Sequence, residues 1–271
     1  MKSFFFLMGL LAIQSVVIAQ RDTTLLVGSV PVDFRFPGVP AQGAILVLPG
    51  WNFSRNDVCI KSDFCETAAK QGYILVLPEM GKSVYASSLF PETRSDYRQY
   101  PQLHWITDTL IPFCRNHFHL FREGERNFLY GISTGARGVA LVAENTGKLF
   151  LAGAALSGDY DPASMPEDRL MTGYYGSFAQ FRERWEGTDN PYLHSGRLKI
   201  PLYLAHGIKD AVVSCQQSLS FSRKILAEDP KLGHEFHTCD TCGHNYAFWR
   251  SQTDAVFRFF EKNAKIIPGR K

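Results

Sequence analysis

The sequence has no block of like charges, no internal repeat and no low-complexity tract. Its net charge is +3, and basic and acidic residues are mixed along the whole chain. Without a basic block, nothing points to nucleic acid or to an anionic membrane surface as a partner. Without a repeat or a linker-like stretch, a solenoid is excluded and a single domain is favoured.

Long apolar runs are absent after the first 20 residues. Within residues 1–19, Lys2 precedes an apolar run and small residues stand near Ala19, which is typical of a cleaved secretory signal peptide. The run is about 16 residues, shorter than the ~20 needed to cross a bilayer, so an uncleaved anchor is disfavoured. The sequence therefore predicts a secreted or periplasmic protein, residues 20–271, that leaves the membrane after cleavage.

Short apolar runs alternate with helix-like segments along the mature chain. The runs end in Gly or Pro and cover residues 43–50, 73–78, 127–131, 149–158 and 200–207. The helix-like segments are 62–72, 103–118, 135–145 and 251–263. Such alternation predicts an α/β protein with a mostly parallel central sheet and helices on both faces. Residues 23–36 alternate in polarity and predict an antiparallel edge hairpin, which makes 43–50 the third strand.

The stretch GISTG, residues 131–135, stands where a strand pattern changes into a helix pattern. A serine nucleophile must stand clear of the sheet, and the tight turn that achieves this crowds the positions two before and two after it. Gly131 and Gly135 remove the side chains that would clash. No other G-x-S-x-G occurs in the chain, so Ser133 is the predicted nucleophile.

A serine nucleophile needs a base that a carboxylate orients. Asp210 follows the run 200–207, at the strand end where ligands bind in open α/β sheets. The alternative is that Asp210 only caps a helix near Val212, and Asp240 is the nearest rival acid. Among eight histidines, His244 alone combines a loop after the last strand-like run with a helix directly ahead. We therefore predict Asp210 as the acid and His244 as the base.

Two backbone N–H groups are needed to hold the oxyanion. One is predicted from Thr134, the residue after the nucleophile, and the other from the loop after the third strand. Pro49 has no N–H, so Gly50, Trp51 or Asn52 must supply it, and we favour Trp51.

Residues 158–198 form a long connection between the sixth and seventh strand-like runs and are rich in aromatic residues. We expect a helical insertion over the active site that helps form the substrate pocket, although the aromatics are equally explained as packing onto the sheet. Its aspartates Asp159, Asp161 and Asp168 fit no EF-hand spacing and predict a solvated loop.

A zinc site is the alternative use of residues 234–244, HEFHTCDTCGH. His234 and His237 are three apart on a strand and point to opposite faces. No second C-x-x-C and no H-E-x-x-H occur, so we expect no metal and no cofactor.

The motifs together resemble the α/β-hydrolase fold, and within it the esterase D-like group of S-formylglutathione hydrolases, feruloyl and acetylxylan esterases and mycolyltransferases. The matching stretches are LVLPGWN, LYGISTGARGVALVAEN, LAGAALSGDYDP, HGIKDAVV and CGHNYAFW. The resemblance implies a catalytic triad of Ser133, Asp210 and His244, with Trp51 and Thr134 as oxyanion donors. The stretch LPGW departs from the DG or SG loop commoner in the group.

The six cysteines of an exported chain favour disulfides. We expect one between Cys59 and Cys65. If the loops of Asp210 and His244 are neighbours, a bridge from Cys215 to Cys239 or Cys242 would hold them in register. The rival is a local bridge between Cys239 and Cys242.

The sequence thus predicts an exported serine hydrolase that cleaves carboxylic esters, of small molecules or linked to carbohydrate, through an acyl-enzyme. Acyl transfer and peptide cleavage are other chemistries for the same triad. A non-catalytic binding protein with the same fold is the alternative from a different functional class. The three intact catalytic positions argue against it, because a binding protein has no need of them.

Overall fold

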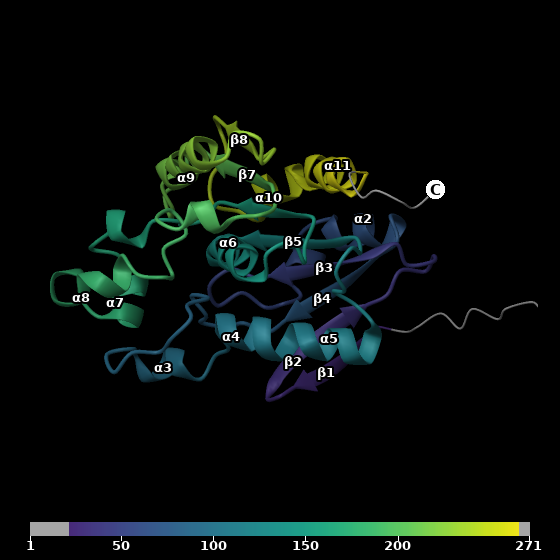
Figure 1. Ribbon diagram of the computed structural model, residues 1–271, viewed down its shortest axis with the longest axis horizontal. Coiled ribbons are helices and arrows are strands. Elements are labelled where there is room, and N and C mark those ends of the chain that lie inside the picture. The colour runs from purple at the N-terminus through teal and green to yellow at the C-terminus, as the bar shows by residue number, and fades with distance from the viewer. Residues whose placement is uncertain (1–21, 266–271) are drawn as a thin grey trace, which may run out of the picture.

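The computed structural model describes residues 22–265, so the predicted signal peptide lies outside the described residues. An eight-stranded sheet runs through its centre in the order β1-β2-β4-β3-β5-β6-β7-β8 (Figure 1). The strands are β1 (Thr23–Val27), β2 (Val30–Arg35), β3 (Gly43–Leu48), β4 (Tyr73–Pro78), β5 (Asn127–Ile132), β6 (Ala152–Leu156), β7 (Leu202–Gly207) and β8 (Glu235–Cys239). From β4 to β8 neighbouring strands are parallel, whereas β1 and β2 form an antiparallel hairpin on the β4 edge.

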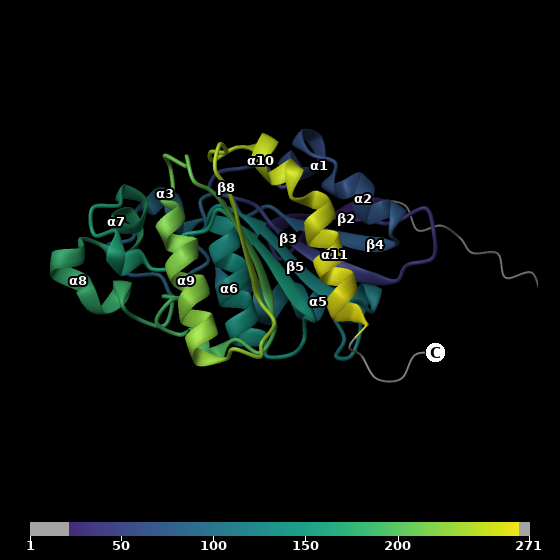
Figure 2. The same ribbon diagram turned by 90° about the horizontal axis from the view of Figure 1, so that it is seen from above.

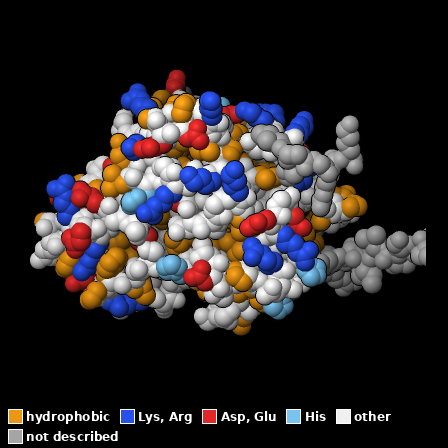
Figure 3. Space-filling model, in the orientation of Figure 1, with side chains coloured by type: hydrophobic (Ala, Val, Ile, Leu, Met, Phe, Trp, Pro, Cys, Tyr) orange, Lys and Arg blue, Asp and Glu red, His pale blue; other side chains and the backbone are white. Residues whose placement is uncertain are grey.

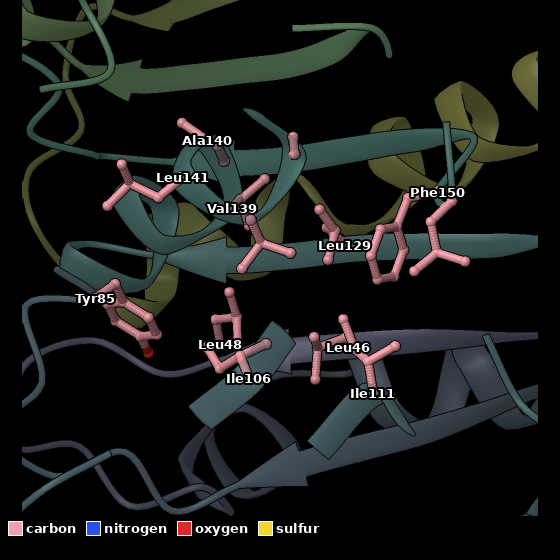
Figure 4. Packing of buried hydrophobic residues seen from close by; sticks show 14 of the residues in the cluster. Leu46, Leu48, Tyr85, Ile106, Ile111, Leu129, Val139, Ala140, Leu141 and Phe150 are labelled. Atoms are coloured by element: carbon pink, nitrogen blue, oxygen red, sulfur yellow. The ribbon is translucent and has the colours of Figure 1, made fainter. Parts of the chain in front are cut away.

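The predicted strands and the edge hairpin are confirmed. All five apolar runs became strands of this sheet, because each carries side chains that are buried on both faces. Leu46 and Leu48 of β3 belong to the core on one face, where Figure 4 shows them near Leu129 and the helix that carries Val139. The alternate residue Val47 belongs to the core on the other face.

Helices cover both faces of the sheet (Figure 2). On the first face lie α4 (Leu103–Trp105), η1 (Ile106–Leu110), α5 (Ile111–Phe118), α6 (Thr134–Thr146) and α9 (Cys215–Glu228). On the second lie α1 (Asp57–Lys61), α2 (Phe64–Lys70), α10 (Tyr246–Ser251) and α11 (Thr253–Ala264). This two-sided cover is the predicted α/β architecture.

The predicted helix 103–118 is continuous but changes its winding ahead of Pro112. The segment η1 is a π-helix, and α5 follows it with Pro112 at its start. Proline has no N–H and its ring crowds the preceding turn, which the wider π turn accommodates.

The connection between β6 and β7 contains η2 (Pro162–Ser164), α7 (Arg169–Tyr175), α8 (Phe178–Trp185) and η3 (Ser195–Arg197). Its aromatics pack with α3 (Ser95–Arg98) into a third, separate core that includes Tyr97, Tyr174, Tyr175 and Trp185. In Figures 1 and 2 these helices lie to one side of the sheet.

The surface carries interspersed charges of both signs on the face that Figure 3 displays. Among residues 22–265, no helix combines the length and the apolar character needed to cross a membrane.

Two disulfides are present, and one differs from the bridge expected. Cys59 is joined to Cys65, as predicted. Cys239 is joined to Cys242, and Cys215 is a free thiol, so the expected long-range bridge is wrong and the local alternative is formed. The expected bridge assumed that Cys215 would face the base loop, but this cysteine is already the first residue of α9.

Candidate active site

Ser133 stands at the sharp turn between β5 and α6. Its backbone has φ 55° and ψ −129°, a region that residues with a side chain rarely occupy. The neighbouring glycines are needed for close approach: a Cβ on Gly131 would lie 2.2 Å from the carbonyl oxygen of Gly135, and one on Gly135 would lie 2.1 Å from that of Leu48. The turn is therefore the strained elbow predicted from GISTG, with α6 beginning directly behind the serine.

The structure brings the three predicted side chains together in one hydrogen-bonded relay. The Ser133 hydroxyl lies 2.9 Å from Nε2 of His244. Nδ1 of the same ring lies 2.6 Å from Oδ2 of Asp210. Since a carboxylate accepts from Nδ1–H, Nε2 is left free to accept the serine proton, which is the tautomer that a general base requires.

Asp210 divides its two oxygens between the loop and the relay. Oδ1 accepts the N–H groups of Val212 and Val213 at 2.9 and 2.8 Å, so Asp210 holds the loop near Val212, where the sequence suggested a helix cap as the alternative. Helix α9 begins only at Cys215, however, with Ser214 as its N-cap. Burial acts to raise the pKa of the Asp210 carboxyl, but the hydrogen bonds from two histidines and from the backbone outweigh it and hold the pKa well below its usual range.

His206 is the second histidine at Asp210, and the sequence did not assign it that position. It is fully buried at the end of β7, as the prediction of a packed core residue required. Its Nε2 donates to the carbonyl oxygen of Val213 at 2.9 Å and lies 3.2 Å from Oδ2 of Asp210, while Nδ1 lies 2.7 Å from the Ser218 hydroxyl. His206 and His244 thus both lie next to Oδ2 of Asp210. The spacing of four residues between His206 and Asp210 was the sequence signal for this contact.

The loop that carries Asp210 (the acid loop) and the loop that precedes His244 (the base loop) are joined by backbone hydrogen bonds. The N–H groups of Ile208 and Lys209 donate to the carbonyl oxygens of Cys239 and Cys242, both at 2.9 Å. The disulfide between Cys239 and Cys242 lies within the loop that precedes His244. The two backbone hydrogen bonds, rather than a long-range disulfide, hold this loop against the loop of Asp210. Asp240, the rival acid, lies in that loop and is exposed.

The loop after β3 lies against the nucleophile. A Cβ on Gly50 would lie 3.1 Å from the Cβ of Ser133. The N–H of Asn52 donates to the carbonyl oxygen of Gly81 at 2.8 Å, so Asn52 is not available as an oxyanion donor. Among the described residues, the N–H groups of Trp51 and Thr134 donate to no protein acceptor, and both residues line the pocket.

A pocket of about 360 Å³ opens over Ser133 and His244, a volume typical of small-molecule sites. Its wall is largely apolar. Five of its side chains come from the connection between β6 and β7: the apolar Met165, Leu170 and Met171, and the acidic Asp159 and Asp168. Within the described range, no three His, Cys, Asp or Glu side chains are grouped to hold a metal ion.

No family model matches the chain, and no curated protein matches it either. Solved structures do match over most of its length. An S-formylglutathione hydrolase from Agrobacterium tumefaciens aligns with a TM-score of 0.70 at 15% identity, covering 90% of this chain and 94% of that one. The chain has the α/β-hydrolase fold.

Two further neighbours show how widely this α/β-hydrolase fold is used. The fluorophosphonate-binding serine hydrolase F of Staphylococcus aureus aligns with a TM-score of 0.67 at 16% identity, covering 90% and 97% of the two chains. A puromycin-hydrolyzing peptidase of Mycobacterium tuberculosis aligns at 0.70 and 16%, covering 90% of this chain but 40% of that one. These neighbours agree with the resemblance read from the motifs, and at such identities they establish the fold alone.

Proposed function

We propose that the protein is an exported serine esterase that cleaves carboxylic esters through an acyl-enzyme. The observation that carries the proposal is the unbroken relay from Ser133 through His244 to Asp210, with bonds of 2.9 and 2.6 Å, at the floor of a pocket. The strained backbone of Ser133 lowers the stability of the folded protein. A hydroxyl that is hydrogen-bonded to an oriented imidazole gives this strain a chemical purpose, because the imidazole can activate the serine as a nucleophile.

In the proposed reaction the Ser133 hydroxyl attacks the ester carbonyl while His244 takes its proton. The imidazolium then returns this proton to the leaving alcohol, and water repeats the cycle to release the acid. Asp210 holds the ring in orientation and compensates its charge. The amides of Trp51 and Thr134 stabilise the oxyanion, and the N-terminus of α6 favours the same negative charge. The proposal requires no cofactor.

Residues 20–271 are proposed to act as one catalytic domain, with the connection 158–198 as an insertion that forms part of the pocket. The lining residues Met165, Leu170 and Met171 support this role. Export to the periplasm or the medium is supported by two disulfides among the described residues, since cytosolic thiols stay reduced. Sequencing the N-terminus of the mature protein tests the cleavage before Gln20.

A fluorophosphonate probe tests the nucleophile. We expect it to modify Ser133, located by peptide mass mapping, and we expect Ser133→Ala to abolish both labelling and turnover of p-nitrophenyl esters. Ser157 is a matched control, since its φ is also 55° but its hydroxyl accepts from Trp249 rather than facing a base. Ser157→Ala should label normally; labelling that survives Ser133→Ala with full turnover would contradict the assignment.

The same enzyme preparation separates ester hydrolysis from its alternatives. Adding an alcohol acceptor and following both products distinguishes acyl transfer from hydrolysis. Matched p-nitroanilides test amide cleavage. A protein that binds these compounds but neither labels nor turns them over would be a binding protein on the same fold.

A further inference from the structure

Asp159 is a buried carboxylate in the wall of the candidate pocket. It follows β6, is 5% exposed and lines the pocket beside Ser133. Its Oδ2 lies 3.5 Å from Nη1 of Arg137. Its Oδ1 has no hydrogen-bond partner within the part of the chain that the structure describes. A buried oxygen without a donor is costly, so an unpaired oxygen on a residue that lines the pocket calls for an explanation.

Arg137 does not satisfy that oxygen, because its guanidinium is engaged by other partners, and its own Nε has no partner among the described residues. The side chain is fully buried in α6, and its Nη2 donates to the Tyr175 hydroxyl and to the carbonyl oxygen of Asp189, both at 2.7 Å. Burial raises the pKa of Asp159 to about 6 even though the charge of Arg137 opposes this shift. In the ionised form, which Arg137 favours, the carboxylate is an acceptor only.

The loop that carries Asp159 is fixed from both ends. The N–H groups of Tyr160 and Asp161 donate to Oε1 of Gln217 at 2.9 and 2.8 Å. On the other side, a Cβ on Gly158 would lie 2.9 Å from that of Ala136, so backbone and helix are in close contact there. The carboxylate is therefore preorganised, as a specific binding group must be.

The surroundings define the chemistry that the carboxylate can recognise. Met165, Leu170 and Met171 line the pocket with apolar surface. Asp168 also lines it, and its negative charge contributes to the raised pKa of Asp159. A polar acceptor within apolar walls matches a ligand with an apolar body that carries an O–H or N–H donor, and a second carboxylate favours a donor with positive charge.

We propose that Asp159 is the specificity-determining residue of this pocket, and that it binds a hydroxyl or ammonium group carried by the ester substrate. The inference rests on the proposed esterase function and deepens it by naming a substrate class. A site built to hydrogen-bond a substrate donor discriminates strongly against the analogue that lacks it, because its own buried group is then left unpaired.

The test compares esters that differ only in the donor. The first panel varies the acyl group: p-nitrophenyl esters of six- and eight-carbon acids that are unsubstituted or carry an ω-hydroxy or ω-amino group. The second panel varies the alcohol: acetate esters of matched simple alcohols, diols and amino alcohols. We expect the wild type to prefer a donor-bearing ester over its plain analogue by about 10- to 100-fold in kcat/KM, the range for a hydrogen bond to a charged group. The better of the two donors identifies which group the site selects.

Variants then assign the preference to Asp159. Asp159→Asn should remove the preference for the ammonium ester and weaken that for the hydroxyl ester, measured as the ratio of kcat/KM between the two members of each pair. The double variant Arg137→Met with Asp159→Asn removes both charges of this pair and should show the same loss if the single variant folds poorly. Asp161→Asn is the matched control, since this carboxylate accepts from Asn190 and does not line the pocket.

The ratio between matched esters separates binding from a structural role, because a distorted pocket would slow both members of a pair together. A wild type that hydrolyses plain esters without preferring any donor-bearing ester on either side would overturn the role of Asp159 and leave the esterase proposal standing. Failure to hydrolyse any ester, together with absent probe labelling, would overturn both.

Discussion

The backbone strain at Ser133 can be measured by replacing the serine with two residues that both lack the hydroxyl. Ser133→Ala keeps a Cβ at φ 55°, whereas Ser133→Gly does not. A residue held in this region costs about 1–3 kcal/mol, and glycine relieves that cost. Glycine also loses about 0.5–1 kcal/mol through the entropy of the unfolded chain. We therefore expect Ser133→Gly to be as stable as Ser133→Ala or up to about 2 kcal/mol more stable.

Urea unfolding with linear extrapolation measures this difference, and thermal unfolding should move by about 2–4 °C per kcal/mol for a domain of this size. Ala255→Gly, at a half-buried position of α11 with ordinary helical geometry, is the control and should lose about 0.5–1 kcal/mol. If Ser133→Gly is less stable than Ser133→Ala by the same amount as this control, the elbow stores no strain and the argument from its geometry is wrong.

Three further results are expected. Asp210→Asn should lower kcat/KM by about four powers of ten through the wrong imidazole tautomer, whereas Asp240→Asn should stay near wild type; steady-state kinetics on a p-nitrophenyl ester decides between them. The pKa of Asp159 is raised in the folded state to about 6 from 3.8, so the folded state binds this proton more tightly than the unfolded chain. The free energy of unfolding should therefore fall as the pH rises from about 4 to 6. Urea midpoints measured across this range should show the fall in the wild type and a smaller one in Asp159→Asn. An alkylating reagent should modify the half-exposed Cys215 in the native, unreduced protein, but Cys114, which is buried with its pKa raised to about 12, only after unfolding; a native protein with no reactive thiol would contradict this disulfide pattern.

The fold was predictable because parallel strands buried on both faces leave a strong local signal. Runs such as 43–50 and 73–78 are apolar throughout and end in Gly or Pro, and a segment with helical periodicity separates them. The strained turn at Ser133 was predictable for a similar reason, since the close approaches at Gly131 and Gly135 are backbone requirements that only glycine meets. Steric requirements of this kind depend on residues that are close in the sequence, so they can be predicted from it.

The disulfide pattern was less predictable because it depends on which way a cysteine faces. The expected hydrogen bond between Asp210 and His244 correctly indicated that their two loops are neighbours, but the sequence carried no information about the direction of the Cys215 side chain. Backbone bonds from Ile208 and Lys209 join the loops instead, and such bonds have no residue-type signature.

Asp159 was misjudged, because the loop around it was expected to be solvated. Its three aspartates suggested exposure, yet Asp159 and the backbone of its neighbours are buried against Gln217 and α6. The missed signal was Arg137, the one basic residue within the apolar pattern of GARGVALVAEN. A fully buried guanidinium requires buried acceptors, since an uncompensated charge in the core costs several kcal/mol. A charge on the core-facing helix behind a nucleophile therefore predicts a carboxylate in the adjoining pocket, and the first acidic residue after the next strand, Asp159, is the one that topology brings there.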